Sequence, residues 1–200
     1  MEIRKFVKEN LLSTKWSGGT TTQLYIYPEN ADFSSRQFDF RISTASIDVE
    51  TSDFTSLNGF ERKLLVLSGN LELEHAEHHS KKMVPFEQDC FLGEWQTKPF
   101  EQDCFLGEWQ TKSRGKAVDF NVIYRPGMET HLFAKTLVSG KSISFNTDKV
   151  LFIYVFSGLV RIGKETAQTG DLIKVFAADS IAVFAEMDST ICTVEWKKEI

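Results

Sequence analysis

The first chemical signal in this sequence is an arginine and a serine on the same side of an alternating stretch. Residues 39–47 read Asp-Phe-Arg-Ile-Ser-Thr-Ala-Ser-Ile, which places Arg41, Ser43 and Ala45 on one face of a strand. The planar guanidinium of arginine suits a carboxylate or a phosphate, because it donates two parallel hydrogen bonds. A face that combines polar donors with small residues is typical of a ligand cavity. The pattern therefore predicts that this strand lines a ligand cavity.

Arg41 has a second interpretation that the sequence leaves open. A charge on an inward strand face often exists to satisfy another buried charge. An ion pair of Arg41 with Asp119 or Asp39 is equally consistent with the pattern.

Other reactive side chains do not form a recognisable catalytic or metal-binding motif. His75, His78 and His79 stand in a polar, loop-like context without an acidic or cysteine partner at a fixed spacing in a rigid element. His131 is isolated, and Cys192 falls in an apolar alternating stretch, where it is expected to pack as a small hydrophobic residue. No Ser-His-Asp or Cys-His arrangement is evident. We therefore predict neither catalytic residues nor metal ligands.

Short alternating segments separated by Gly, Asp, Asn and Ser predict an all-β protein with little helix. The 17 Phe residues and the many Val, Ile and Thr favour strands, because branched and aromatic side chains fit a pleated sheet. A hairpin is expected at residues 68–70, where Gly69 can take a positive φ. The expected strands are residues 24–27, 39–47, 63–67, 71–73, 118–124, 130–137, 141–145, 150–156, 159–162, 172–176, 180–185 and 190–196.

Composition narrows the class of protein further. With 42% hydrophobic residues the chain has ample material for a packed core, and a net charge of −5 argues against nucleic-acid binding. The amino-terminal residues do not resemble a secretory signal, and the most apolar run, residues 150–160, is too short to span a bilayer. Three cysteines without a disulfide framework fit a reducing compartment. A cytoplasmic protein that binds neither nucleic acid nor membrane is expected.

One segment is duplicated in tandem. Residues 85–98 recur without a change as residues 99–112. Two copies are too few for a repeat architecture, so a recent in-frame duplication, or an artefact of sequence assembly or cloning, explains the identity best. The sequence does not show which copy occupies the native strand, although the second is contiguous with the strand expected at residues 118–124.

Several spaced motifs together resemble those of the HutD/Ves family of bicupin proteins. The likeness extends from about residue 6 to residue 196. Ser17, Asn58 and the duplication depart from the family pattern. The motifs are Trp-Ser-Gly-Gly-Thr-Thr at 16–21, Phe-Arg-Ile-Ser-Thr-Ala at 40–45, Asp-Phe at 53–54, Gly-Phe-Glu-Arg at 59–62, Leu-Ser-Gly at 67–69 and Asp-Phe-Asn at 119–121.

The resemblance implies two cupin-like β-barrels or sandwiches, placed by us at residues 1–125 and 126–200. In the cupin pattern a metal-binding Glu stands seven positions before a glycine. Here Arg62 stands seven before Gly69, and the two histidine positions fall among residues 55–58 without a histidine. Leu151 occupies the matching place before Gly158, so the second barrel also lacks the ligand set. No metal or other cofactor is therefore expected, and the family implies a homodimer.

The resemblance also completes the expected ligand site. Arg62 would anchor an anion, Arg41 and Ser43 would donate from a second face, Asn121 would orient the ligand and Trp16 would form an aromatic wall. Two structural alternatives remain open: Arg62 could pair with a neighbouring acidic residue, and Trp16 could belong to the core.

Three functions remain in view. The favoured one is a non-catalytic protein that binds a small carboxylate and has a regulatory role in histidine utilisation or in a stress response. The first alternative is a metal-free isomerase or lyase in which Asp119 or a nearby Glu acts as the acid-base group. The second is a metal-dependent cupin enzyme with atypical ligands.

Overall fold

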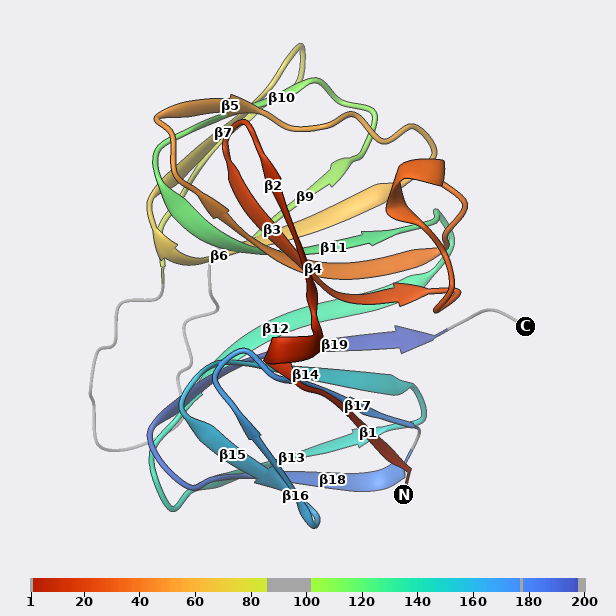
Figure 1. The fold of residues 1–200 in the computed structure, drawn as a ribbon, viewed down its shortest axis with the longest axis vertical. Coiled ribbons are helices and arrows are strands. Elements are labelled where there is room, and N and C mark those ends of the chain that lie inside the picture. Colours follow the sequence, from red (N-terminus) through yellow and green to blue (C-terminus); the bar gives the residue numbers. More distant parts are fainter. Residues whose placement is uncertain (1, 86–101, 177, 198–200) are drawn as a thin grey trace. The chain divides into compact units, whose positions relative to one another are not determined.

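A computed structural model describes residues 2–85, 102–176 and 178–197 (Figure 1). Strands account for nearly all of its regular structure, which confirms the expected all-β class. The helices of the described part are two 3-10 turns, η1 (Lys8–Asn10) and η2 (Phe33–Ser35). None of the described helices is long and apolar enough to cross a membrane. The chain divides into two compact units, Leu12–Gly127 and Met1–Leu11 with Met128–Ile200.

The unit Leu12–Gly127 consists of two antiparallel sheets. The larger has the order β2-β3-β4-β11-β6-β9, and the smaller has the order β5-β10-β7-β8. The strands are β2 (Leu12–Trp16), β3 (Gly19–Tyr27), β4 (Phe40–Ile47), β5 (Thr51–Asp53), β6 (Glu61–Gly69), β7 (Leu71–His75), β8 (Ser80–Met83), β9 (Gln102–Leu106), β10 (Thr111–Arg114) and β11 (Ala117–Tyr124).

The other unit also has two antiparallel sheets, with the orders β1-β17-β14-β19-β12 and β13-β18-β15-β16. Its aliphatic core includes Leu151, Ile153 and Val155 from alternate positions of β14. The strands are β1 (Ile3–Phe6), β12 (Glu129–Leu137), β13 (Ser142–Thr147), β14 (Val150–Ser157), β15 (Leu159–Ile162), β16 (Glu165–Gln168), β17 (Leu172–Val175), β18 (Ala178–Ala185) and β19 (Ser189–Lys197).

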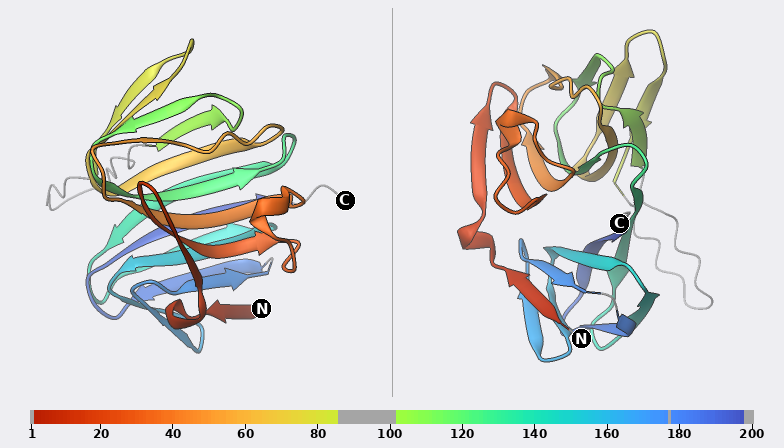
Figure 2. Two further views of the ribbon diagram at one scale, coloured as in Figure 1. Left: turned by 45° about the horizontal axis from the view of Figure 1, so that its top comes forward. Right: turned by 90° about the vertical axis from the view of Figure 1, so that its right-hand side faces the viewer.

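The first strand of the chain belongs to the carboxy-terminal unit. β1 pairs antiparallel with β17, with Ile3 opposite Val175 and Phe6 opposite Leu172, and Figure 2 shows it beside the strands of that unit. Buried Asp171 holds the segment in place by accepting a hydrogen bond from the Lys8 backbone N–H at 3.0 Å. The division predicted between residues 125 and 126 placed these first residues in the amino-terminal barrel instead.

The central strands of the larger sheet put apolar and polar side chains on opposite faces. Along β4, Phe40 and Ile42 are fully buried, and the alternate residues Arg41 and Ser43 point to the other face. The alternation predicted for residues 39–47 is therefore present. β11 lies between β4 and β6, so three strands present one continuous face.

The second copy of the duplicated segment supplies regular structure. Residues 102–112 contain β9 and the first residues of β10, and Phe105 is buried against the core. Residues 86–98 of the first copy lie outside the described residues. The predicted turn at Gly69 is also present, with φ of +78° at the end of β6.

Candidate functional site

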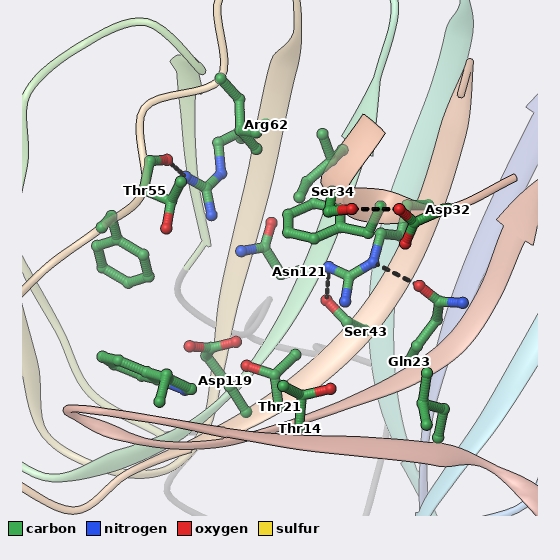
Figure 3. Close-up of a pocket in the computed structure, with 18 of the residues that line it drawn as sticks. Thr14, Thr21, Gln23, Asp32, Ser34, Ser43, Thr55, Arg62, Asp119 and Asn121 are labelled. Atoms are coloured by element: carbon green, nitrogen blue, oxygen red, sulfur yellow. Dashed lines mark hydrogen bonds between the residues drawn. The ribbon is translucent and has the colours of Figure 1, made fainter. Parts of the chain in front are cut away.

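A cavity of about 520 Å³ lies within the unit Leu12–Gly127. Its lining comes from β2, β3, β4, β6 and β11, from the end of β5 and the segment that follows it, and from the segment that contains η2. All five residues that the sequence singled out, Arg62, Arg41, Ser43, Asn121 and Trp16, line this one cavity. Figure 3 shows Asn121 between Arg62 and Ser43, with Asp119 on the same side of the sheet.

The two arginines come from strands on either side of β11. Ile123 of β11 is opposite Arg41 of β4 and opposite Arg62 of β6, so both side chains project from the same row of the sheet. Only 7% of Arg41 and 5% of Arg62 is exposed. Pairing across three adjacent strands thus gathers two positive charges in one buried place.

Neutral groups hold the two guanidinium ions. Arg41 Nε donates to Gln23 Oε1 at 3.0 Å and its Nη1 donates to Ser43 Oγ at 3.0 Å (Figure 3). Arg62 Nη1 donates to the carbonyl oxygen of Thr55 at 3.2 Å. Within the described chain, neither arginine forms an ion pair, so the alternatives in which Arg41 pairs with Asp119 or Asp39, or Arg62 with a neighbouring acid, are not found.

Aromatic rings complete the surroundings of the arginines. The guanidinium carbon of Arg41 lies 4.2 Å from the centre of the Phe33 ring, and that of Arg62 lies 5.2 Å from Phe54 and 5.3 Å from Phe105. Cations above aromatic faces are attracted to the ring quadrupole. The rings carry no net charge, so these contacts leave the positive charge of both arginines uncompensated.

Asp119 and Asn121 contribute unpaired acceptors from β11. Asp119 is 1% exposed and Asn121 is 6% exposed. Neither carboxylate oxygen of Asp119 has a hydrogen-bond partner among the described residues, and the same holds for Oδ1 of Asn121. Trp16 Nε1 and Arg62 Nε are likewise buried donors without a partner there. Buried polar groups are nearly always satisfied in proteins, so this cluster is unusual.

Burial shifts the pKa values of the charged groups. It raises the pKa of Asp119 to about 7, although Arg62 and Arg41 act in the opposite direction. Burial lowers the pKa of Arg41 to about 10, with Arg62 adding to this effect, and it lowers the pKa of Arg62 to about 10, with Asp119 opposing. Both arginines therefore stay charged at neutral pH, and the net charge of the three groups is positive.

Trp16 has both of the roles considered from sequence. It lines the cavity, and it also packs against the core cluster that contains Ile47 and Ala117. The cavity is also lined by Gln23, Phe33 and threonines of β2 and β3, which were not predicted as site residues. Residues 20–23 read Thr-Thr-Thr-Gln, so every position is polar and no alternation marks which side chains face the cavity.

The cavity residues do not fit a divalent metal ion. Two buried guanidinium ions would repel a cation, and the one deeply buried carboxylate, Asp119, is a single ligand. In the described part of the chain, no three His, Cys, Asp or Glu side chains are grouped so that they could hold a metal. His75 is not loop-like as expected: it ends β7, is 3% exposed and forms a hydrogen bond with Thr111 Oγ1 at 2.8 Å.

Comparison with solved structures defines the class of protein. The fold matches a conserved protein of unknown function from Pseudomonas aeruginosa PAO1 with a TM-score of 0.77 and 16% identity, over 99% of this chain and 100% of that one. It matches the bacterial pirin YhhW from Escherichia coli, in complex with nickel(II), with a TM-score of 0.70 and 12% identity, over 97% and 98% of the two chains. The chain therefore has a cupin-like fold.

The family is defined by the sequence itself. Residues 8–199 match the HutD family, and the chain belongs to it. A structure of HutD from Pseudomonas fluorescens SBW25, from a formate condition, is similar, with a TM-score of 0.70, 19% identity and coverage of 98% of this chain and 100% of that one. Comparison with curated proteins gives no match.

Proposed function

We propose that this HutD-family protein binds a small carboxylate anion in the cavity and does not catalyse a reaction. The observation that supports this proposal is the pair of buried arginines, which form no ion pair in the described part of the chain. A buried charge needs a partner, and a carboxylate would offer one that matches the guanidinium fork. The cavity volume of about 520 Å³ falls in the range typical of small-molecule sites.

Calorimetric titration of the purified protein with formate, urocanate and N-formylglutamate tests this proposal. We expect at least one of these carboxylates to bind. Arg62→Met should weaken that binding by at least about thirtyfold, because it removes the charged hydrogen-bond donor. Methionine is unbranched and apolar, so it can fill the space of the arginine stem.

Arg114→Met is the matched control for this titration. Arg114 lies in the same unit, but 61% of its side chain is exposed and it pairs with Glu74 at the surface. The control removes the same charge outside the cavity, so its affinity should stay within about twofold of the unaltered chain. Equal affinity of the unaltered chain and Arg62→Met would refute the role of this arginine.

We also propose a regulatory role in histidine utilisation or in a stress response, and membership of the HutD family supports this proposal. Its test is transcription of histidine-degradation genes in a deletion strain that is complemented with the unaltered gene or with Arg62→Met. If both alleles restore normal transcription, the regulatory role does not depend on anion binding by Arg62. We also propose a cytoplasmic homodimer, which light scattering after size-exclusion chromatography would test.

A metal-free isomerase or lyase is the second candidate, and Asp119 is the observation that favours it. A carboxyl group with a pKa of about 7 is suited to exchange protons near neutral pH. Turnover of a small carboxylate with a bell-shaped pH profile that is lost in Asp119→Asn would favour the enzyme over the binding protein. The alternative of a metal-dependent enzyme is tested by elemental analysis of protein purified without a histidine tag, which would detect a bound metal.

A further inference from the structure

Among the strands that the structure describes, β12 is the longest edge strand of the carboxy-terminal unit. The two sheets of this unit end in β1, β12, β13 and β16 (Figure 1). β12 has nine residues, whereas the other three have four to six. A long edge strand presents a row of backbone hydrogen-bonding groups to any strand that comes beside it. β12 therefore offers the largest edge of this unit for pairing with another chain.

The other edges of this unit carry features that discourage pairing, and β12 lacks these features. Natural proteins protect sheet edges with short strands, β-bulges and proline. β1 and β16 are short, and the pairing of β13 with β18 shifts register between Phe145 and Thr147. β12 pairs with β19 along its whole length without a register shift, and it contains no proline. Its outer edge is therefore regular enough to accept a further strand.

An apolar side chain is exposed in the middle of β12. Phe133 is 51% exposed, although large apolar side chains are mostly buried in proteins. It shares a face of the strand with Glu129, His131 and Lys135, because alternate residues lie on the same side. This face has an acidic group at its start, two aromatic rings in its middle and a basic group towards its end.

This order of side chains is complementary to itself. When two identical strands pair antiparallel across a two-fold axis, the numbers of opposite residues have a constant, even sum, so the face is kept. With Leu132 at the axis, Glu129 lies opposite the partner's Lys135, and His131 then lies opposite the partner's Phe133. With Phe133 at the axis, Glu129 would have no cation opposite it. Opposite charges across a pair of strands are stabilising, so the first register is favoured.

Glu129 has room for a second cation. Lys149 and His131 of the same chain both contact Oε1 of its carboxylate, which leaves Oε2 for another donor. The hydrogen bonds from Lys149 and His131 lower the pKa of Glu129 to about 2. The carboxylate is therefore ionised at neutral pH, and it can attract the partner's Lys135.

We propose that two copies of this chain pair antiparallel through β12 and join their sheets into one continuous sheet. Glu129 of each copy lies opposite the partner's Lys135, and the exposed ring of Phe133 becomes covered. The inference rests on the homodimer proposed above and assigns its interface. A second copy is the occupant that this edge fits, because its charges match the same charges in reverse order.

Analytical ultracentrifugation over a series of dilutions tests this proposal by measuring the dissociation constant of the dimer. We expect the unaltered chain to be a dimer. Phe133→Lys should raise the dissociation constant at least about twentyfold, because it removes the apolar contact and places two further cations in the interface. Met187→Lys is the matched control: Met187 is 52% exposed in the same unit but lies between β18 and β19. Its dissociation constant should stay within about twofold of that of the unaltered chain.

A reversal of charge tests the register. Lys135→Glu alone should weaken the dimer about tenfold, because it places carboxylates opposite each other on both sides of the axis. Addition of Glu129→Lys makes the opposite charges complementary again, so the double variant should return to within about threefold of the unaltered chain. Two unrelated structural effects would add up instead of cancelling. Thermal melting checks that each variant is folded.

The outcomes separate this interface from the homodimer itself. A dimer that Phe133→Lys leaves unchanged overturns the β12 interface, while the homodimer stands. A monomeric unaltered chain overturns both, and the carboxylate function is unaffected because its titration does not require a dimer. If a dimer forms only after removal of residues 85–98, a second copy is not the occupant of this edge in the unaltered chain. No recovery in the double variant overturns the pairing of Glu129 with Lys135, and this arm stays decisive even if Phe133→Lys does not fold.

Discussion

The charged residues of the site, Arg41, Arg62 and Asp119, are almost fully buried. Arg41 and Arg62 are held by Gln23, Ser43 and a backbone carbonyl, which are all neutral partners. The carboxylate of Asp119 faces the same cavity, and neither of its oxygens accepts a hydrogen bond from a described residue. Such an arrangement lowers stability, because each buried charge loses its hydration. A bound ligand would offset that loss by satisfying donors and acceptors together.

The raised pKa of Asp119 predicts how stability depends on pH. The carboxyl titrates at about 7 in the folded chain and at its ordinary value of 3.8 when exposed. Between these values the unfolded chain is ionised and the folded chain is protonated, so a rise in pH favours unfolding. The ligand-free protein should therefore lose up to about 4 kcal/mol of stability between pH 4 and pH 8 through this group.

Urea unfolding of the unaltered chain and Asp119→Asn at several pH values measures this effect. The difference in free energy of unfolding between the two should change mainly between pH 4 and pH 7 and level off above that range. A difference that stays constant with pH would mean that the pKa of Asp119 is not raised in the folded chain.

Some of these residues could be predicted from sequence, and others could not. Arg41 and Ser43 follow from strict alternation, and Arg62 follows from its spacing before Gly69. Gln23 was missed because the pairing of β3 with β4 shifts register between Gln23 and Tyr25, which breaks the alternation. Phe33 was missed because it lies in a 3-10 turn, which has no periodic signal.

Among the elements, β11 organises the site. It carries Asp119, Asn121 and Ile123 on the cavity face and pairs along its length with β4 and β6. The expected strands at residues 39–47 and 118–124 correspond closely to β4 and β11, since central strands have the clearest alternation. Short strands such as β2, β5, β8 and β16 were not predicted, because so few residues with mostly exposed side chains carry little pattern.

Gly69 gives a prediction at this scale. A Cβ at Gly69 would meet the Lys116 carbonyl oxygen at 2.1 Å, and the residue has φ of +78°. Gly69→Ala should therefore destabilise the hairpin between β6 and β7 through both backbone strain and collision with β11. Gly127→Ala is the matched control, because Gly127 has φ of +88° and an added Cβ there would meet no atom within 4 Å.

We expect Gly127→Ala to lower the free energy of unfolding by about 1 to 2 kcal/mol, which is the strain of a left-handed residue. Gly69→Ala should lower it by roughly 2 kcal/mol more, because the collision adds to the strain. Chemical unfolding of the three proteins gives both values. Equal losses in the two variants would show that the close approach to β11 does not matter.

For the whole molecule, the all-β class followed from the alternating segments, and the cupin-like fold followed from six spaced motifs. The family match over residues 8–199 agrees with the motifs. The placement of β1 in the carboxy-terminal unit did not follow from sequence. Residues 3–6 read Ile-Arg-Lys-Phe. This strand is short and carries two charges, so its pairing with β17 could not be recognised from these residues. Long-range pairing of this kind leaves no local signal.

The duplication gives a prediction for the molecule as a whole. Removing residues 85–98 leaves one complete copy, and the described structure builds β9 and the start of β10 from the second copy. The shortened chain should therefore keep its melting temperature within about 3 °C, since it retains Phe105 in the core. It should also keep its affinity for carboxylates. Loss of cooperative unfolding in a thermal scan would show that both copies are needed.

We propose above all that Arg62 binds an anion within the cavity. Calorimetric titration of N-formylglutamate into the unaltered chain and into Arg62→Met, with Arg114→Met alongside, tests it most directly. We expect the unaltered chain and Arg114→Met to bind the ligand, and Arg62→Met to bind it at least about thirtyfold more weakly. Binding of equal strength in all three folded proteins would contradict it.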